Sequence, residues 1–240
     1  MTDEEGKGIR PAWQWDEDRQ AGTDYADVSE VERYDRRMGE FRDFAAEDAS
    51  ILEELALPGR SRILEVGTGT GHFARAAAKA GHRVTAVDVS PVMLEYAASR
   101  ASAEGLQGIE FSRAGFLTLS CAPGAFDGVV SVAALHHLPD LWKAVALQNV
   151  NRALRPGGRF VLRDVVFSWE GEGHPACFES FIGSFPESTR GGAVIHAARE
   201  YSTLDWIMDG LLRRAGFRIV RAVAGESCLV RYLCEKERAD

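Results

Sequence analysis

The residues with the clearest chemical potential lie in a glycine loop and at an acidic position downstream of it. Glu65, Gly67, Gly69 and Gly71 follow a short apolar run and lead directly into a helical pattern. Glycines let a ligand approach the backbone, and the next helix offers free N–H groups. Asp88 follows about 20 positions after the first glycine, at the end of the next expected strand. A carboxylate there can accept hydrogen bonds from two ribose hydroxyls, so the pair predicts a nucleoside site.

The spacing of the glycines bears on which nucleotide is bound. A dinucleotide-binding loop reads GxGxxG, but the last position is His72 in this chain, and Gly71 makes the pattern ExGxGxG from Glu65. This spacing favours a nucleoside over a dinucleotide. The alternatives are a loop that only closes a turn and an Asp88 that only caps a strand end, although Ser90 is better placed to cap the next helix.

Two adjacent histidines are the candidate catalytic residues. His136 and His137 follow the apolar run 126–132, at the edge of a parallel sheet where ligands bind. A histidine near its usual pKa of about 6.5 can act as a general base or orient a substrate. The alternative is that one or both cap the turn before Pro139 or pack beside the nucleoside.

Charged residues inside the expected strand 159–167 need partners because a buried charge is costly. Arg163 and Asp164 are adjacent, so they point to opposite faces and only one should face the site; a structural ion pair is favoured. A metal site from His136, His137, His174 and Asp164 is not expected, because the paired histidines lack the i, i+4 helical spacing.

Alternating patterns predict an α/β domain. Short apolar strands are expected at residues 62–66, 83–89, 109–112, 126–132 and 159–167, with helices at 73–80, 90–104 and 139–154 between them. Such alternation implies parallel βαβ units with right-handed crossovers. The last two strands, 217–223 and 228–234, follow a helix at 204–215 and are separated only by residues 224–227. This link permits a hairpin, so one of them must run antiparallel to its neighbour.

Two segments lie outside this core. Residues 1–34 form an acidic arm or lid with Trp13 and Trp15, and the spacing of apolar residues over 30–57 predicts an amphipathic helix. On that helix, Tyr34 and Arg37 are candidates to close over the ligand. The insertion 168–201 has aromatic residues among glycines, which fits either a mobile cover over an apolar pocket or a small helical cap. The main domain is expected to span residues 35–240.

Composition excludes several classes of protein. The 240 residues are 45% hydrophobic and 27% charged, as in ordinary globular proteins. Residues 1–60 hold 17 of the 36 acidic but only 8 of the 28 basic residues, so a basic face for nucleic acid is not expected. No apolar run approaches the length of a membrane span, and the start lacks a signal-peptide pattern. Four scattered cysteines fit reduced thiols in a cytoplasmic protein.

Four stretches resemble the successive motifs of class I S-adenosylmethionine-dependent methyltransferases, in the same order and spacing. They are ILEVGTGTGHFA at 63–74, AVDVSPVML at 86–94, FDGVVSVAALHHLPD at 126–140 and NRALRPGGRFVLRD at 151–164. The resemblance covers residues 35–235. It implies a three-layer, Rossmann-like α/β fold whose mostly parallel sheet has seven strands, the last of them antiparallel.

The resemblance also implies the cofactor, S-adenosylmethionine, and the residues around it. Those around its amino-acid end would be Glu65, Gly67, Gly69 and Gly71. Asp88 would bind the ribose hydroxyls, with Val89 and Met93 against the adenine. The family often has an acid after the third strand to receive the adenine amino group. The matching position here is Gly115, so adenine recognition is expected to rest on backbone groups and on Phe116.

The sequence therefore predicts a cytoplasmic enzyme that transfers a methyl group from S-adenosylmethionine to a small molecule, without a metal, nucleic-acid or membrane partner. Bound cofactor supplies the reactivity, so the protein needs mainly to align the acceptor. A nicotinamide-dependent oxidoreductase and a non-catalytic S-adenosylmethionine-binding protein are the alternatives. The accepting atom and the oligomeric state are left open.

Overall fold

The computed structural model describes residues 11–19, 31, 35, 38–39, 42–225 and 228–238. Its centre is a sheet in the order β3-β2-β1-β4-β5-β8-β7, with the short β6 paired to the end of β5. The strands are β1 (Arg62–Val66), β2 (Arg83–Asp88), β3 (Ile109–Arg113), β4 (Phe126–Val132), β5 (Leu154–Phe167), β6 (Thr203–Leu204), β7 (Phe217–Ala224) and β8 (Leu229–Lys236).

The direction of the strands confirms the expected topology. Strands β1 to β5 pair in parallel, whereas β8 lies between β5 and β7 and is antiparallel to both. The short link between β7 and β8 forces this arrangement because it cannot cross the sheet. The molecule thus has the seven-stranded, mostly parallel α/β sheet expected from the sequence, with β6 added at the end of β5.

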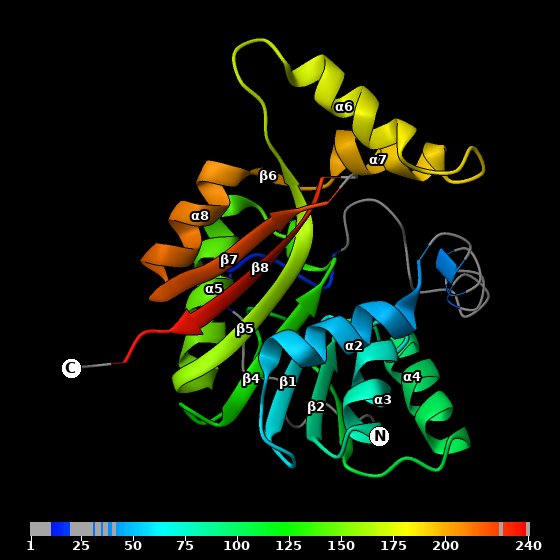
Figure 1. Cartoon of the computed structure of the whole chain (residues 1–240), viewed down its shortest axis with the longest axis vertical. Helices are drawn as coiled ribbons and strands as arrows, with labels where there is room; N and C mark the ends of the chain where they lie inside the picture. Colours follow the sequence, from blue (N-terminus) through cyan, green and yellow to red (C-terminus); the bar gives the residue numbers. More distant parts are fainter. Residues whose placement is uncertain are drawn as a thin grey trace.

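Helices cover both faces of the sheet and make three layers (Figure 1). On one face, α2 (Phe44–Leu55) and α3 (His72–Lys79) bury Ile51, Leu55 and Phe73 against the strands. On the other face lie α5 (Asp140–Ala153) and α8 (Asp205–Arg214), whose Leu147 and Leu212 belong to the larger core. Because both faces are covered, the central strand β4 is apolar along most of its length.

Local signals place several helix ends. Ser90 caps α4 (Pro91–Ala103): its hydroxyl accepts the N–H of Met93 at 3.3 Å, and Pro91 occupies the first turn, as predicted. The single helix expected over residues 30–57 is wrong. Arg42 and Asp43 are not helical, and the Asp43 carboxylate accepts the N–H of Ala46 at 3.0 Å to begin α2. Tyr34 and Arg37 lie outside the described residues.

The fifth strand begins earlier than expected. The helix α5 ends at Ala153, and β5 starts at Leu154, so the Pro-Gly-Gly segment at 156–158 lies within the strand instead of separating it from the helix. The pairing with β4 shifts register between Phe126 and Gly128 to accommodate this segment.

The insertion 168–201 folds as a helical cap. It contains α6 (His174–Gly183) and α7 (Arg190–Arg199), which lie beyond the carboxyl end of β5 (Figure 1). Phe181 and Ala193 are buried there against Val165 and Phe167 of β5. Its aromatic residues therefore form a small core of their own, and the same helices roof the region above the sheet.

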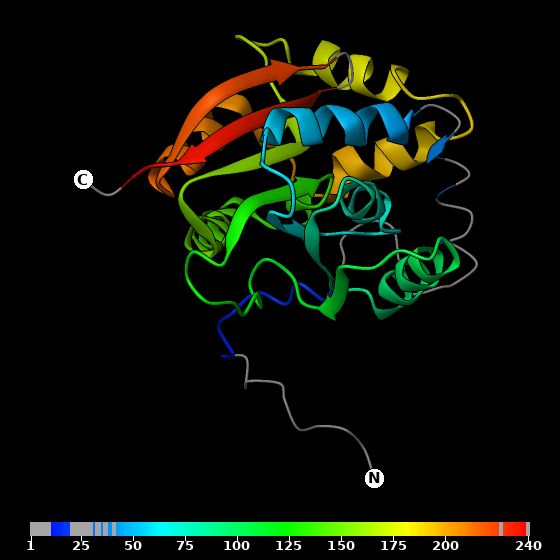
Figure 2. The ribbon, with the colours of Figure 1, turned by 60° about the horizontal axis from the view of Figure 1, so that its bottom comes forward.

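The described part of the arm, residues 11–19, packs beside the loop between β3 and β4 (Figure 2). Trp15 packs against the larger core. Among the described residues, no helix is long and apolar enough to cross a membrane. All four cysteines are free.

Candidate active site

The glycine loop connects β1 to α3 and is held close to the end of β2. The N–H groups of Gly67 and Thr68 donate to the carbonyl of Val87 at 2.9 and 3.0 Å. Gly67 has a φ of +76°, and a Cβ on it would lie 2.4 Å from the Cβ of Ala134. Both constraints require glycine at this position. The loop is thereby fixed where the strand order reverses, between β1 and β4, which is the usual ligand crevice of such sheets.

Asp88 contacts the same loop from the end of β2. Its Oδ2 accepts the N–H of Gly69 at 2.9 Å, and its Oδ1 accepts the N–H of Ser90 at 2.9 Å. Burial raises the pKa of Asp88, although these backbone donors oppose the rise. Each oxygen retains capacity for a further donor, as two vicinal hydroxyls would supply.

Glu65 is the second buried carboxyl group at this edge. Its Oε2 accepts the hydroxyl of Thr68 at 2.6 Å. Burial, together with the nearby charges of Asp48 and Asp88, raises the pKa of Glu65 to about 8, with the Thr68 bond opposing. A cationic group brought beside it would stabilise the carboxylate and lower that pKa.

These residues line a cavity of about 550 Å³ at the carboxyl edge of the sheet. Such a volume is typical of small-molecule sites. Of the residues predicted to bind a cofactor or to act in catalysis, the cavity wall contains Glu65, Gly67, Gly69, Asp88, Val89, Met93, Gly115, Phe116, His136 and His137. Gly71 lies elsewhere: it begins α3, and a Cβ on it would lie 2.8 Å from that of Ala97 in α4. Its lack of a side chain allows the two helices to approach.

The cavity wall near Gly115 includes Glu17, which no sequence pattern indicated. The carboxylate of Glu17, from the N-terminal arm, lies beside Gly115 and lines the cavity together with Val89, Met93 and Phe116. No local pattern signals this contact, because the residues it joins are about 100 positions apart in the chain.

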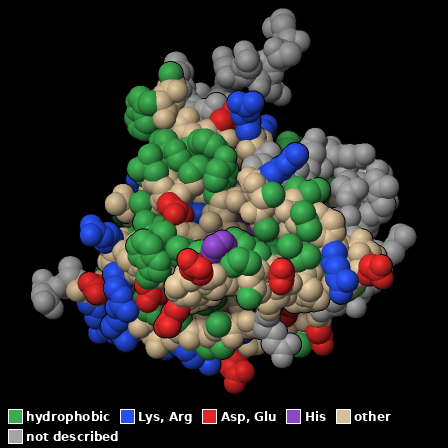
Figure 3. Space-filling view, turned by 90° about the horizontal axis from the view of Figure 1, so that it is seen from above, with side chains coloured by type: hydrophobic (Ala, Val, Ile, Leu, Met, Phe, Trp, Pro, Cys, Tyr) green, Lys and Arg blue, Asp and Glu red, His purple; other side chains and the backbone are tan. Residues whose placement is uncertain are grey.

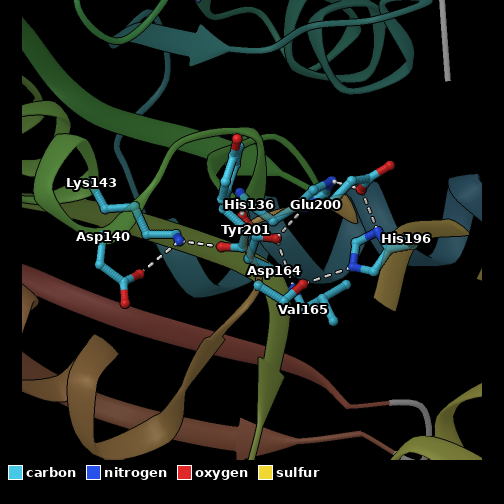
Figure 4. Close-up of polar contacts among 9 residues, drawn as sticks. His136, Asp140, Lys143, Asp164, Val165, His196, Glu200 and Tyr201 are labelled. Carbon is cyan, nitrogen blue, oxygen red and sulfur yellow. Dashed lines mark hydrogen bonds and ion pairs between the residues drawn. The ribbon is translucent and has the colours of Figure 1, made fainter. Parts of the chain in front are cut away.

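His136 lies between two carboxylates (Figure 4). Its Nδ1 is 2.5 Å from Oδ1 of Asp164, and its Nε2 is 3.2 Å from Oε2 of Glu200. Its backbone N–H donates to Oδ2 of Asp164 at 3.1 Å. Burial opposes a charge on the ring, but the two carboxylates outweigh it and raise the pKa of His136 to about 9. His136 is therefore an imidazolium at neutral pH and has both ring nitrogens engaged.

His137 has the opposite character. Burial and the neighbouring charge of His136 lower the pKa of His137 to about 4, so its ring is neutral. Its buried Nδ1 has no hydrogen-bond partner in the described structure. The His137 ring lines the cavity, whereas this nitrogen is turned away from open space, so a bound molecule would reach it only after the ring reorients.

The adjacent residues Arg163 and Asp164 of β5 have different partners, and only one of them lines the cavity, as predicted. Arg163 donates to Oε2 of Glu47 in α2 at 2.7 Å and lines the cavity, whereas Asp164 holds His136. Among the described residues, His136, His137 and Glu200 have ligand atoms within 4.8 Å of one another, the spacing of a potential metal site. A cation there would compete with the proton that the two carboxylates stabilise on His136. His174 takes no part in this group and packs against Trp169.

The helical cap supplies the outer wall of the cavity. Phe181, Phe185, Ala193 and Ile195 add apolar surface, and Glu200 follows α7. His196 of α7 forms an ion pair with Glu200, so the polar network joins the cap to the sheet. Viewed from above, this face shows gathered hydrophobic side chains with histidine visible among them (Figure 3).

The two strand ends and the roofed cavity form a site of the size and polarity that a nucleoside ligand requires. Residues 63–158 match the protein family described as "Methyltransferase domain". A solved S-adenosylmethionine-dependent methyltransferase from Aquifex aeolicus superposes with a TM-score of 0.63 at 19% identity, over 88% of this chain and 98% of that one. This likeness confirms the fold.

Two curated relatives show similarity in sequence. "S-adenosyl-L-methionine-dependent Diels-Alderase iccD" from Talaromyces variabilis is 41% identical over 49% of this chain and 41% of its own length. "Methyltransferase GfsG" from Streptomyces halstedii is 33% identical over 48% of this chain and 42% of its own length. The chain thus matches less than half the length of these relatives.

Residues 63–158 are accordingly similar to the methyltransferase domain family, and the solved S-adenosylmethionine-dependent enzyme from Aquifex aeolicus shares their fold. The site fits the cofactor of that family, S-adenosylmethionine. Asp88 has acceptor capacity for its ribose, Glu65 is a buried acid suited to its amino group, and a Cβ on Gly69 would meet no atom within 4 Å, so the space above the loop is open.

Proposed function

We propose that this protein is a methyltransferase that uses S-adenosylmethionine to methylate a small molecule. The observation that carries the proposal is a shared cavity. The nucleoside-binding residues Gly69 and Asp88 and the polar groups His137 and Glu200 line the same space of about 550 Å³. A cofactor and an acceptor can therefore meet there.

Different residues would bind the cofactor and orient the acceptor. S-adenosylmethionine supplies an electrophilic methyl group when it is bound. Asp88 would hold its ribose, and Glu65 would receive its amino group at the glycine loop. His137 has a neutral ring on the cavity wall, so it is suited to orient the acceptor through a hydrogen bond rather than to remove its proton. His136 and Asp164 would position that wall and keep a positive charge beside it.

The shape of the site supports a small acceptor. Helices α6 and α7 contribute Phe181, Ala193 and Ile195 to the wall of the cavity. A partly roofed, largely apolar cavity of this size favours a compact molecule over a polymer segment. The polar groups His137 and Glu200 favour an acceptor that carries a hydroxyl or amino group.

The direct test is transfer of label. The protein is incubated with methyl-tritiated S-adenosylmethionine and a panel of small hydroxyl and amino compounds, and the organic products are counted. We expect label in at least one compound, with equal molar formation of S-adenosylhomocysteine. The His137→Ala protein should bind S-adenosylhomocysteine normally but transfer little label. Tight binding of reduced nicotinamide dinucleotide, without binding of S-adenosylhomocysteine, would favour the oxidoreductase instead.

A second candidate is a cyclisation reaction without methyl transfer. The named Diels-Alderase relative is 41% identical over half of this chain, and the apolar cap of this chain could enclose a folded substrate. Stoichiometry separates the two functions: a methyltransferase consumes one S-adenosylmethionine per product, whereas a cyclase forms product with the cofactor unchanged.

A further inference from the structure

We propose that Glu17, carried by the N-terminal arm, provides the carboxylate that recognises the 6-amino group of the cofactor's adenine, in place of a side chain at Gly115. The inference rests on the proposed function, because it concerns the cofactor of that reaction. It assigns a ligand-binding role to a segment outside the matched methyltransferase region, which begins at residue 63.

The position of the carboxylate is the first argument. A Cβ built on Gly115 would lie 2.3 Å from Oε2 of Glu17 and 2.4 Å from its carboxyl carbon. The Glu17 carboxylate therefore occupies the space in which a side chain of residue 115 would begin. Because glycine has no side chain, the arm can place its acid at this point after β3.

The hydrogen bonds of Glu17 are the second argument. Its Oε1 accepts the N–H of Thr118 at 2.8 Å and the Thr118 hydroxyl at 2.7 Å. The N–H of Leu117 lies 3.0 Å from both oxygens. An aspartate at residue 115 would reach these same N–H groups, two and three residues ahead of it, in a local turn. Glu17 thus reproduces from a distance the contacts that a local acid would make.

The remaining acceptor capacity is the third argument. A carboxylate oxygen can accept about two hydrogen bonds, and Oε2 receives only the shared Leu117 N–H in the described structure. Burial raises the pKa of Glu17, with the backbone and Thr118 bonds opposing. A further donor would stabilise the buried charge. Glu17 lines the cavity beside Val89, Met93 and Phe116, where an exocyclic amino group is such a donor.

The arm is anchored immediately before this contact. The ring of Trp13 stacks on Trp142 of α5 with centroids 6.4 Å apart, and Trp15 meets Tyr201 edge-on at 5.6 Å. The side-chain amide of Gln14 donates to the carbonyl of Leu117 at 3.3 Å. These contacts hold Glu17 at a defined depth, which a specific contact with a base requires.

A thermodynamic cycle tests the contact through binding alone. Calorimetry compares S-adenosylhomocysteine with its analogue in which hydrogen replaces the 6-amino group, on the wild-type protein and on Glu17→Gln. We expect loss of the amino group to weaken binding to the wild type by about tenfold or more, and to Glu17→Gln by less than about threefold. Equal losses in the two proteins would overturn the inference and leave Glu17 as an anchor of the arm.

The same experiment separates this inference from the proposed function. If the wild-type protein does not bind S-adenosylhomocysteine, the proposed function and the inference fail together. If it binds, but removal of the 6-amino group weakens binding equally in the wild type and in Glu17→Gln, only the inference fails. Asp18→Asn is the matched control: it changes the neighbouring acid of the arm, which pairs with Arg113 at 3.4 Å outside the cavity wall, and should preserve the wild-type discrimination.

A relocation experiment guards against a folding defect in the arm. Glu17→Ala should lose discrimination for the amino group, and adding Gly115→Asp to that variant should restore part of it. The restoration is expected to be partial because a Cβ at residue 115 also comes within 2.7 Å of a Val89 methyl group. In the wild-type background Gly115→Asp should weaken binding, since two carboxylates would compete for one place. If a folded double variant regains no discrimination for the 6-amino group, the inference is contradicted.

Discussion

Glu65 and Asp88 place two buried carboxyl groups on one cavity wall, and neither forms an ion pair among the described residues. Burying carboxylates without a cation is unfavourable, so the free protein keeps part of this charge neutralised by protons. The site is therefore electrostatically incomplete until a cationic ligand enters. This property links cofactor binding to pH.

We expect the affinity for S-adenosylhomocysteine to rise as pH increases from 7 to 8 and then to level off. The pKa of Glu65 is raised to about 8 in the free protein, so binding of an ammonium group must displace a proton below that pH. The gain should approach, but not exceed, about tenfold for one pH unit. This range of pH 7 to 8 lies above the pKa of Asp48, which burial raises to about 6, so Asp48 does not account for the expected change in affinity.

Calorimetry in buffers of different ionisation enthalpy measures the proton released on binding. The Glu65→Gln protein should bind more weakly and lose the pH dependence. Affinity that is constant over this range, with no proton release, would show that Glu65 does not face the amino group.

The two histidines should respond differently to substitution. His137→Ala removes a neutral ring with an unpaired nitrogen, so turnover should fall by about 10²-fold or more while stability changes little. His136→Ala leaves Asp164 and Glu200 buried without their shared cation, which should destabilise the fold by about 3–5 kcal/mol. Urea unfolding and label transfer measure the two effects.

The pH dependence of stability provides the control for His136. Its pKa is raised in the folded protein to about 9, so its contribution is complete below pH 6.5 and is lost as pH rises through 9. His136→Gln should flatten this part of the stability curve, and His137→Gln should not. The reverse pattern would mean that the charge resides on His137.

At the scale of elements, the cap of α6 and α7 is a cluster separate from the main core. Phe181 is its most buried aromatic residue, packed against Phe167 and Phe185 at centroid distances of 5.3 and 5.2 Å. Such satellite clusters open locally at a lower free energy than the central sheet. The cap can therefore open without disturbing β1 to β4.

Phe181→Ala should loosen the cap selectively. Hydrogen exchange measured by mass spectrometry should accelerate over residues 174–199, while amides of β1 and β4 keep their protection. The comparison variant is Val194→Ala, because Val194 lies on α7 but is 49% exposed. Uniform acceleration across the sheet would show that the cap and the core unfold as one unit.

Comparison of the predicted and observed elements shows which of them local sequence patterns can locate. Strands β1 and β4 coincide with the predicted ranges 62–66 and 126–132, because apolar runs bounded by loop residues are local signals. The prediction of one helix over residues 30–57 overlooked the start of α2 at Phe44, because the helical spacing of apolar residues continues across Asp43. The side chain of Asp43 caps α2. The cap helices were left undecided, since their glycines and aromatic residues fit a loop equally well.

Part of the candidate site could be predicted from sequence, and part could not. Gly67 and Gly69 follow β1, and Asp88 ends β2, so a sequence motif and a parallel topology bring them together. The carboxylates around His136 come from β5 and from the end of the cap, and Glu17 comes from the arm. Contacts over such separations depend on tertiary packing and leave no local pattern.

On the scale of the whole molecule, three segments meet over one crevice. The sheet provides the glycine loop and Asp88, the arm provides Glu17, and the cap provides Phe181 and Glu200. The crevice lies where the strand order reverses, whereas a second hollow, lined by Arg62, Gly108 and Phe126, lies at the opposite, amino ends of the strands. Ligands of open parallel sheets bind at the carboxyl ends, which singles out the first.

We propose that the ends of β1 and β2 together hold the adenosyl group. The most direct measurement is a calorimetric titration of S-adenosylhomocysteine into the wild-type protein and Asp88→Ala. We predict saturable one-to-one binding to the wild type and an affinity lower by about 10- to 100-fold in the variant, because a charge-assisted bond to the ribose is lost. Unchanged affinity in a folded Asp88→Ala protein, or no binding to the wild type, would contradict an adenosyl site at these strand ends.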